Sequence, residues 1–156
     1  MEIRSVLFLC HTNMCLSPLA EGLLKSILEK KKIQANIDSA GFEAYHINES
    51  PDKRALKKGQ DHGIDISGKK VRLFSREDFD KFDKIYVMDT LSNRNALYFA
   101  RNEEDKNKIE FLMNVINPGK NESVPDCFYA KLEAGDESYK ILEKACTLIA
   151  KQIKKG

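Results

Sequence analysis

Residues 8–18 read Phe-Leu-Cys-His-Thr-Asn-Met-Cys-Leu-Ser-Pro and join an apolar segment to an amphipathic one. The apolar run 6–9 ends at Cys10, and a short loop follows. Ser17 is a good N-cap, and Pro18 suits the first position of a helix. A strand, a loop and a helix N-terminus in this order build an anion site, because loop N–H groups and the positive end of the helix dipole converge there. A thiol facing that field should ionise more readily than a free cysteine, so Cys10 is a candidate nucleophile.

Beyond this stretch, strand-like and helix-like patterns alternate, which is typical of an α/β fold with a mostly parallel sheet. Strands are expected near residues 4–9, 35–39, 84–88 and 109–113. Helices are expected over residues 18–28, 51–61, 76–82, around 96–99 and over about 136–154, with a loop-rich stretch at 114–134. We predict one doubly wound, flavodoxin-like domain over residues 1–156, in which helices flank a central four-stranded parallel sheet. Its ligand site should lie at the carboxyl ends of the strands.

The composition narrows the class of protein. Hydrophobic residues make up 42% and charged residues 32% of the 156 residues, which is ordinary for a soluble protein. A formal net charge of +2 with dispersed lysines does not favour a nucleic-acid partner. No apolar stretch approaches the roughly 20 residues of a membrane span, and the first apolar segment is too short for a signal peptide. We therefore expect a cytoplasmic protein without a membrane partner, whose four irregularly spaced cysteines are reduced.

The motifs resemble those of the low-molecular-weight protein tyrosine phosphatases. In that family the first loop reads Cys-x-Gly-Asn-x-Cys-Arg-Ser-Pro, which this chain matches at Cys10, Asn13, Cys15, Ser17 and Pro18. The likeness continues in order through Ala20-Glu21-Gly22, Asp38-Ser39-Ala40-Gly41, Pro51-Asp52-x-Arg54-Ala55, His62-Gly63-Ile64, Glu77-Asp78-Phe79-x-x-Phe82-Asp83, Met88-Asp89 and Val124-Pro125-Asp126. It covers nearly the whole chain, and it implies the fold of that family and the hydrolysis of phosphotyrosine.

The resemblance also implies a role for individual residues. Cys10 would take the phosphoryl group, so no metal or organic cofactor is expected. Ser17 would stabilise the thiolate, although N-capping alone would also explain a serine there. Asn13 and Ser39 would hold the loop in shape by hydrogen bonds. The phosphate loop between Cys10 and Ser17 comprises His11, Thr12, Asn13, Met14, Cys15 and Leu16.

The substrate implied by the resemblance is a phosphotyrosine protein or a small aryl phosphate. Inorganic phosphate or sulfate is expected to be able to occupy the loop. Asp126 resembles the general acid that protonates the leaving phenolate and then activates water, but the family's following proline is Cys127 here, which leaves that loop less rigid. Tyr45, Phe128 and Tyr129 are candidates for the walls of a cleft that holds an aromatic ring.

Two residues of the predicted phosphate loop depart from the family pattern. Leu16 stands where the family has an arginine whose planar fork grips two phosphate oxygens. By analogy with other phosphoryl-transfer arginines, its loss should cost about 10³–10⁵ in rate. Thr12 replaces a glycine and would fit poorly if the position required a positive φ. Arg72, His11 or Lys69 are candidates for a compensating cation.

Three functions therefore stay open. The first is a tyrosine phosphatase with impaired activity, and the second is a pseudophosphatase that binds a phosphorylated or anionic partner without turning it over. The third concerns thiols. A Cys10–Cys15 disulfide could act as a redox switch, as the resemblance implies, and a soft-metal site from Cys10, Cys15, Cys127 and His11 is a further alternative. The related arsenate reductases need further cysteines near residues 80–95, where this chain has none.

Overall fold

The computed structural model describes residues 2–125 and 132–153 and contains a four-stranded sheet with helices on both faces. All strands are parallel and lie in the order β2-β1-β3-β4. The strands are β1 (Ser5–Leu9), β2 (Asn36–Ala40), β3 (Lys84–Val87) and β4 (Ile109–Phe111). The helices are α1 (Leu16–Lys30), α2 (Lys53–Asp61), α3 (Asp78–Lys81), α4 (Thr90–Phe99), α5 (Glu103–Lys108), the 3₁₀ helix η1 (Leu112–Val115) and α6 (Leu132–Gln152). This arrangement confirms the predicted α/β class and its parallel sheet.

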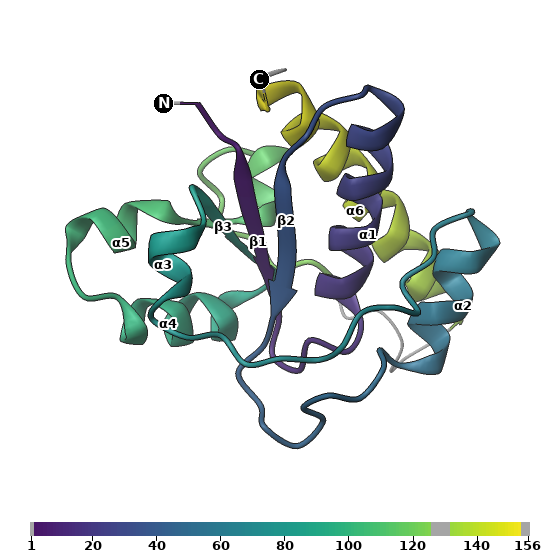
Figure 1. The fold of residues 1–156 in the computed structure, drawn as a ribbon, viewed down its shortest axis with the longest axis horizontal. Coiled ribbons are helices and arrows are strands. Elements are labelled where there is room, and N and C mark those ends of the chain that lie inside the picture. Colours follow the sequence, from purple (N-terminus) through teal and green to yellow (C-terminus); the bar gives the residue numbers. More distant parts are fainter. Residues whose placement is uncertain (1, 126–131, 154–156) are drawn as a thin grey trace.

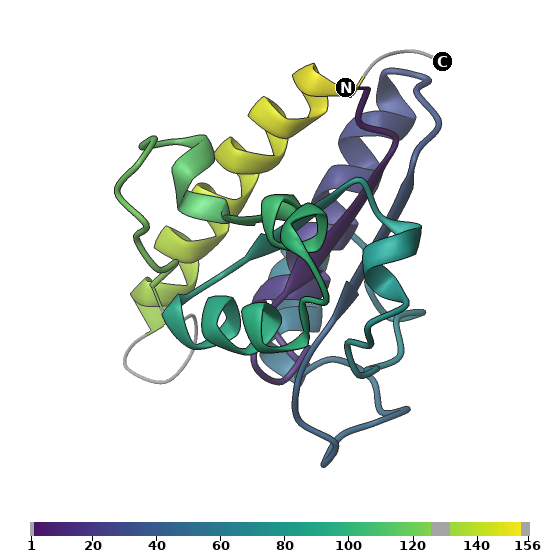
Figure 2. The ribbon, with the colours of Figure 1, turned by 90° about the vertical axis from the view of Figure 1, so that its left-hand side faces the viewer.

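The side chains on the two faces of β1 belong to two separate hydrophobic clusters. Because side chains alternate along a strand, Val6 and Phe8 point to one face while Leu7 and Leu9 point to the other. The first pair packs with the apolar faces of α1 and α6, which lie alongside one another (Figures 1 and 2). The second pair packs with residues from α3 and α4 on the opposite side of the sheet. All five residues of β1 are buried, so this strand anchors the segment that follows it.

The loops that follow β1 and β2 lie side by side at the carboxyl edge of the sheet (Figure 1). The N–H of Phe42 donates to the carbonyl oxygen of His11 at 2.8 Å, which ties the two loops together. The N–H of Asp52, the N-cap of α2, donates to the carbonyl oxygen of Met14 at 2.8 Å. The segment 10–15 is therefore hydrogen-bonded to the loop after β2 and to the start of α2, at the edge of the sheet where the ligand site was predicted.

Several boundaries differ from the prediction. Helix α1 begins at Leu16 with Cys15 as its N-cap, so the assignment of Ser17 as N-cap and Pro18 as first helical residue was wrong. Helix α5 was not predicted, because its sequence Glu-Glu-Asp-Lys-Asn-Lys has no apolar periodicity. Helix α6 begins at Leu132 rather than near residue 136. No helix within the described ranges is both long enough and apolar enough to cross a membrane.

Candidate functional site

Cys10 follows β1 directly, and its sulfur lies between the loop and the start of α1. The thiol is free, and the residue is only 6% exposed. Its Sγ lies 2.9 Å from Ser17 Oγ and accepts the backbone N–H of Asn13 at 3.2 Å. The strand end, the loop and the helix start thus converge on one potential nucleophile.

Asn13 sets the direction of the hydrogen bonds around this sulfur. Its buried side chain accepts the backbone N–H of Arg72 at Oδ1 (3.1 Å), which identifies the oxygen of the amide and leaves Nδ2 as the donor. Nδ2 donates to Ser17 Oγ at 2.9 Å and to Ser39 Oγ at 2.9 Å. Because the Ser17 oxygen already accepts from Asn13, its own proton is directed at the Cys10 sulfur.

The backbone of the loop is shaped by Asn13 and Gly41. Asn13 has a φ of 60°, a left-handed conformation that asparagine tolerates better than most residues. Thr12 does not have a positive φ, so the strain considered for a β-branched residue there is absent, and its Oγ1 accepts the N–H of Met14 at 3.2 Å. A Cβ on Gly41 would lie 2.8 Å from the backbone N of Asn13 and 2.9 Å from the carbonyl oxygen of His11. The segment after β2 can approach the loop this closely only because residue 41 is glycine.

The start of α1 adds electrostatic attraction for an anion. The first N–H groups of a helix lack partners within the helix and carry the positive end of its dipole. The N-cap residue Cys15 makes no side-chain hydrogen bond to them. The carbonyl oxygens of His11 and Met14 are tied to donors outside the loop, so the N–H groups of the same planar peptide units point away from those donors. The loop can therefore present backbone N–H groups to a negatively charged ligand.

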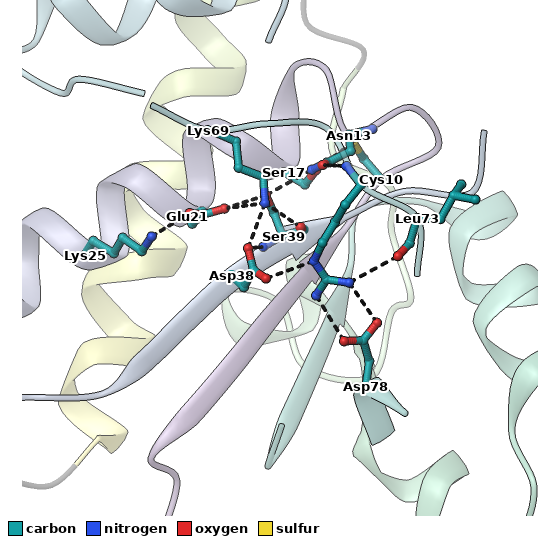
Figure 3. Close-up of polar contacts among 11 residues, drawn as sticks. Cys10, Asn13, Ser17, Glu21, Lys25, Asp38, Ser39, Lys69, Leu73 and Asp78 are labelled. Carbon is teal, nitrogen blue, oxygen red and sulfur yellow. Dashed lines mark hydrogen bonds and ion pairs between the residues drawn. The ribbon is translucent and has the colours of Figure 1, made fainter. Parts of the chain in front are cut away.

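The three residues considered as substitutes for an arginine at position 16 all contact carboxylates. Arg72 binds Asp78 through both terminal nitrogens, at 3.0 and 3.1 Å, and Asp38 through Nε at 2.9 Å. Lys69 Nζ lies 2.7 Å from an oxygen of the Asp38 carboxylate (Figure 3). His11 Nε2 lies 3.3 Å from a carboxylate oxygen of Glu43.

The ion pairs of Asp38 and Arg72, behind the loop, shift the pKa values of both groups. Partial burial works against the charged form of Asp38, but the hydrogen bond and charge of Lys69, together with the charge of Arg72, outweigh it and hold the pKa of Asp38 below its ordinary value. Burial likewise opposes the charge of Arg72, yet Asp78 and Asp38 raise the pKa of the Arg72 guanidinium. Both groups are therefore ionised at neutral pH and are occupied with one another.

Leu16 stands at the position where the resemblance predicts an arginine. The residue is 7% exposed and belongs to the hydrophobic cluster that also contains Cys10 and Leu19. Its side chain supplies packing and no charge. The loop thus has backbone donors, a helix N-terminus and a thiol, but residue 16 contributes no cation to it.

Comparisons with known proteins identify the family of the chain. A model of the family described as low molecular weight phosphotyrosine protein phosphatase matches residues 5–156. The chain belongs to the low-molecular-weight phosphotyrosine protein phosphatase family. Members of this family are hydrolases of phosphotyrosine.

Two curated phosphatases and one solved structure show how extensive the similarity is. Low molecular weight phosphotyrosine protein phosphatase 2 of Drosophila melanogaster is 31% identical, over 97% of this chain and 90% of its own. The phosphatase of this family from Gallus gallus is 31% identical, over 93% of this chain and 92% of its own. The protein tyrosine phosphatase of Entamoeba histolytica, solved with Hepes in its active site, superposes with a TM-score of 0.84 at 30% identity, over 93% of each chain.

The structure places some predicted site residues together and leaves others apart. Cys10, Asn13, Ser17 and Ser39 form one connected, buried set. Tyr45 is 81% exposed, and its ring contacts that of His46 at a centroid distance of 5.0 Å, so its contact with a substrate ring stays a prediction. The residues Asp126, Cys127, Phe128 and Tyr129 lie outside the described residues.

The cysteines differ from the expectation that all four are reduced. Cys10 and Cys146 are free thiols, whereas Cys15 is disulfide-bonded. Cys10 and Cys15 are therefore not paired with one another in this structure. Burial raises the pKa of the Cys146 thiol and makes it a poor nucleophile. Within the described ranges, no three His, Cys, Asp or Glu side chains gather where they could hold a metal ion.

Sequence reasoning gave no structural role to Glu21, which is 6% exposed and accepts the Ser39 hydroxyl at 2.6 Å. The spacing of the apolar residues in α1 could have indicated that Glu21 is buried. Residue 21 precedes Leu24 and Leu28 by three and seven positions, so a carboxylate falls on the buried face of the helix. A charge at such a position needs a buried partner, and Lys69 supplies it at 3.2 Å.

Proposed function

We propose that the chain hydrolyses phosphotyrosine or small aryl phosphates through a phosphoryl group carried on Cys10, at a rate reduced by Leu16. The observation that carries the proposal is the Cys10 sulfur, which accepts the N–H of Asn13 at 3.2 Å and lies 2.9 Å from the Ser17 hydroxyl. In the reaction, the Cys10 thiolate would attack phosphorus, and the phenolate would leave as the phenol by taking a proton from a general acid, the role predicted for Asp126. Water, activated by the same carboxylate as it takes a proton back, would then release inorganic phosphate and restore the thiolate.

The site favours binding of the anionic phosphoryl group, but it supplies less positive charge than the reaction would use. Phosphoryl transfer depends mainly on positioning and on stabilising negative charge around the phosphoryl oxygens. Backbone N–H groups and the N-terminus of α1 supply part of that stabilisation. Arg72 and Lys69 are paired with carboxylates, so neither replaces the fork that an arginine at position 16 would offer.

The deciding experiment measures turnover of 4-nitrophenyl phosphate by the purified chain and by Cys10→Ser. We expect slow turnover in the parent chain and none above background in the variant, with equal melting temperatures. Mass spectrometry of a rapidly quenched reaction should detect a phosphoryl group on Cys10. Turnover that survives Cys10→Ser would contradict the proposal.

The second function, a pseudophosphatase that binds an anionic partner, is favoured by the burial of Leu16 in place of a cation. Calorimetric titration with inorganic phosphate and phosphotyrosine separates the two. Millimolar binding without turnover would favour the binding module, whereas binding with turnover would favour the enzyme. Absence of binding would contradict both.

A further inference from the structure

Lys69 is a nearly buried ammonium group behind the phosphate loop. Its side chain is 9% exposed. Its Nζ lies 2.7 Å from Asp38 Oδ1, 2.7 Å from the carbonyl oxygen of Ser39 and 3.2 Å from Glu21 Oε1 (Figure 3). The Asp38 carboxylate and the Ser39 carbonyl each accept a hydrogen bond from this ammonium, and Glu21 faces it as an ion pair. Lys69 is therefore fixed in place by the end of β2 and by α1.

Glu21 connects this ammonium to the hydrogen bonds of the loop. Its Oε1, the same oxygen that faces Lys69, accepts the hydroxyl of Ser39 at 2.6 Å. A carboxylate can only accept, so the Ser39 proton points to Glu21 and the Ser39 oxygen is left to accept Nδ2 of Asn13. The hydrogen bonds then run in one direction from Asn13 to Ser17 and from Ser17 to the Cys10 sulfur.

The charge of Lys69 supports this direction at Ser39, while the backbone N–H of Arg72 identifies Oδ1 of Asn13. A buried carboxylate without a counter-ion is costly, and the neutral form that relieves the cost can donate as well as accept. A neutral Glu21 could donate its proton to the Ser39 oxygen, where it would compete with Nδ2 of Asn13, the amide nitrogen that also orients Ser17. Lys25 also binds Glu21, at 2.6 Å, but its side chain is 54% exposed and water can replace it.

We propose that Lys69 is a positioning residue of the phosphate loop, whose buried charge fixes the direction of the hydrogen bonds that end on the Cys10 sulfur. The proposal rests on the proposed role of Cys10 as the reactive thiol. It does not require turnover, because the reactivity of the sulfur can be measured by alkylation. Failure of the proposed phosphatase activity and failure of this inference are therefore distinguishable.

The test compares rates of Cys10 alkylation by iodoacetamide, located by tandem mass spectrometry, in the parent chain, Lys69→Met, Lys69→Arg and Lys25→Met. At about pH 7 we expect Lys69→Met to react about three- to tenfold more slowly, the scale of one weakened hydrogen bond to a charged group. At about pH 10, where even an unassisted thiol is ionised, its rate should approach that of the parent. Lys69→Arg should restore much of the rate, and Lys25→Met should stay within about twofold of the parent because exposed pairs contribute little.

The direction of the change separates positioning from a loss of structure. A loop that merely opens exposes the thiol, so Lys69→Met would then react faster at every pH, and this result would overturn the proposal. An unchanged rate would overturn it as well. If Lys69→Met does not fold, Ser39→Ala removes the link between Glu21 and Asn13 while it leaves the Lys69 ion pairs in place. The same slowing at about pH 7 is expected there, and a parental rate in a folded Ser39→Ala would contradict the route through Ser39.

Discussion

The hydroxyl oxygen of Ser17 lies 2.9 Å from the Cys10 sulfur and 2.9 Å from Nδ2 of Asn13, which donates to it. A serine hydroxyl has one proton, so the donor on one side commits that proton to the sulfur on the other. Ser17 was predicted to cap α1, but the helix begins two residues earlier than predicted, and the Ser17 hydroxyl contacts the thiol instead. The relationship places the Ser17 hydroxyl on the Cys10 sulfur rather than at the start of the helix.

Ser17→Ala should therefore lower the turnover number more than it lowers stability. A hydrogen bond to a charged group contributes about 1.5–3 kcal/mol, which corresponds to a roughly 10- to 100-fold fall in kcat for an aryl phosphate. Ser26→Ala in the same helix is the matched control and should leave kcat unchanged, because Ser26 lies further along α1. Equal kcat values for the parent and Ser17→Ala would show that the hydroxyl does not act on the sulfur.

Gly41→Ala should distort the phosphate loop by steric contact. The new Cβ would lie 2.8 Å from the backbone N of Asn13 and from the backbone carbonyl carbon of Thr12, and neither can move without the loop. We expect the free energy of unfolding to fall by about 1–3 kcal/mol, the usual cost of overpacking, with weaker phosphate binding. Gly68→Ala meets no atom within 4 Å and should change stability by less than about 0.5 kcal/mol. Urea denaturation and phosphate titration of both variants check this, and equal effects of the two would refute the steric explanation.

Asp38 should make stability depend on pH on the acid side. Its pKa is lower in the folded protein, where Lys69 and Arg72 outweigh the effect of burial, than in the unfolded chain. Between the two values the unfolded chain binds more protons, so stability rises with pH there. The contribution is complete above the unfolded value of about 3.9 and is lost as the pH falls through the lower folded value.

Asp38→Asn removes this titration. Urea unfolding of the parent between about pH 5 and pH 2 should lose more free energy than unfolding of Asp38→Asn over the same range. The variant starts from a lower stability at neutral pH, because Lys69 and Arg72 lose a charged, partly buried partner. The slope is therefore the quantity to compare, and parallel pH curves would contradict the assignment.

The fold and the loop were predictable because their signals are local. The apolar run that ends at Cys10, followed by a helix start, predicts a strand, a loop and a helix from neighbouring residues alone. The same holds for α2, whose predicted start at residues 51–52 coincides with Asp52 as an N-cap that accepts the N–H of Arg54. Helix α5 was not predicted, because a short, fully polar segment has no hydrophobic periodicity.

The support behind the loop was not predictable, because its partners are distant in sequence. Asp38 meets Lys69 across 31 residues and Arg72 across 34, and Ser39 meets Glu21 across 18. Arg72 and Lys69 were candidates for a substrate-binding cation, yet the structure pairs both with carboxylates. Charge alone does not tell a structural cation from a ligand-binding one, since burial and partners decide.

The most direct test asks whether the loop lacks only the cation at position 16. We expect folded Leu16→Arg to raise kcat/KM for 4-nitrophenyl phosphate by about 10²- to 10³-fold, less than the 10³–10⁵ associated with such arginines, because the surroundings of Leu16 are packed for an apolar side chain. The rise should vanish when Cys10→Ser is added. A folded Leu16→Arg with unchanged or lower kcat/KM would contradict an anion site that is complete except for its charge.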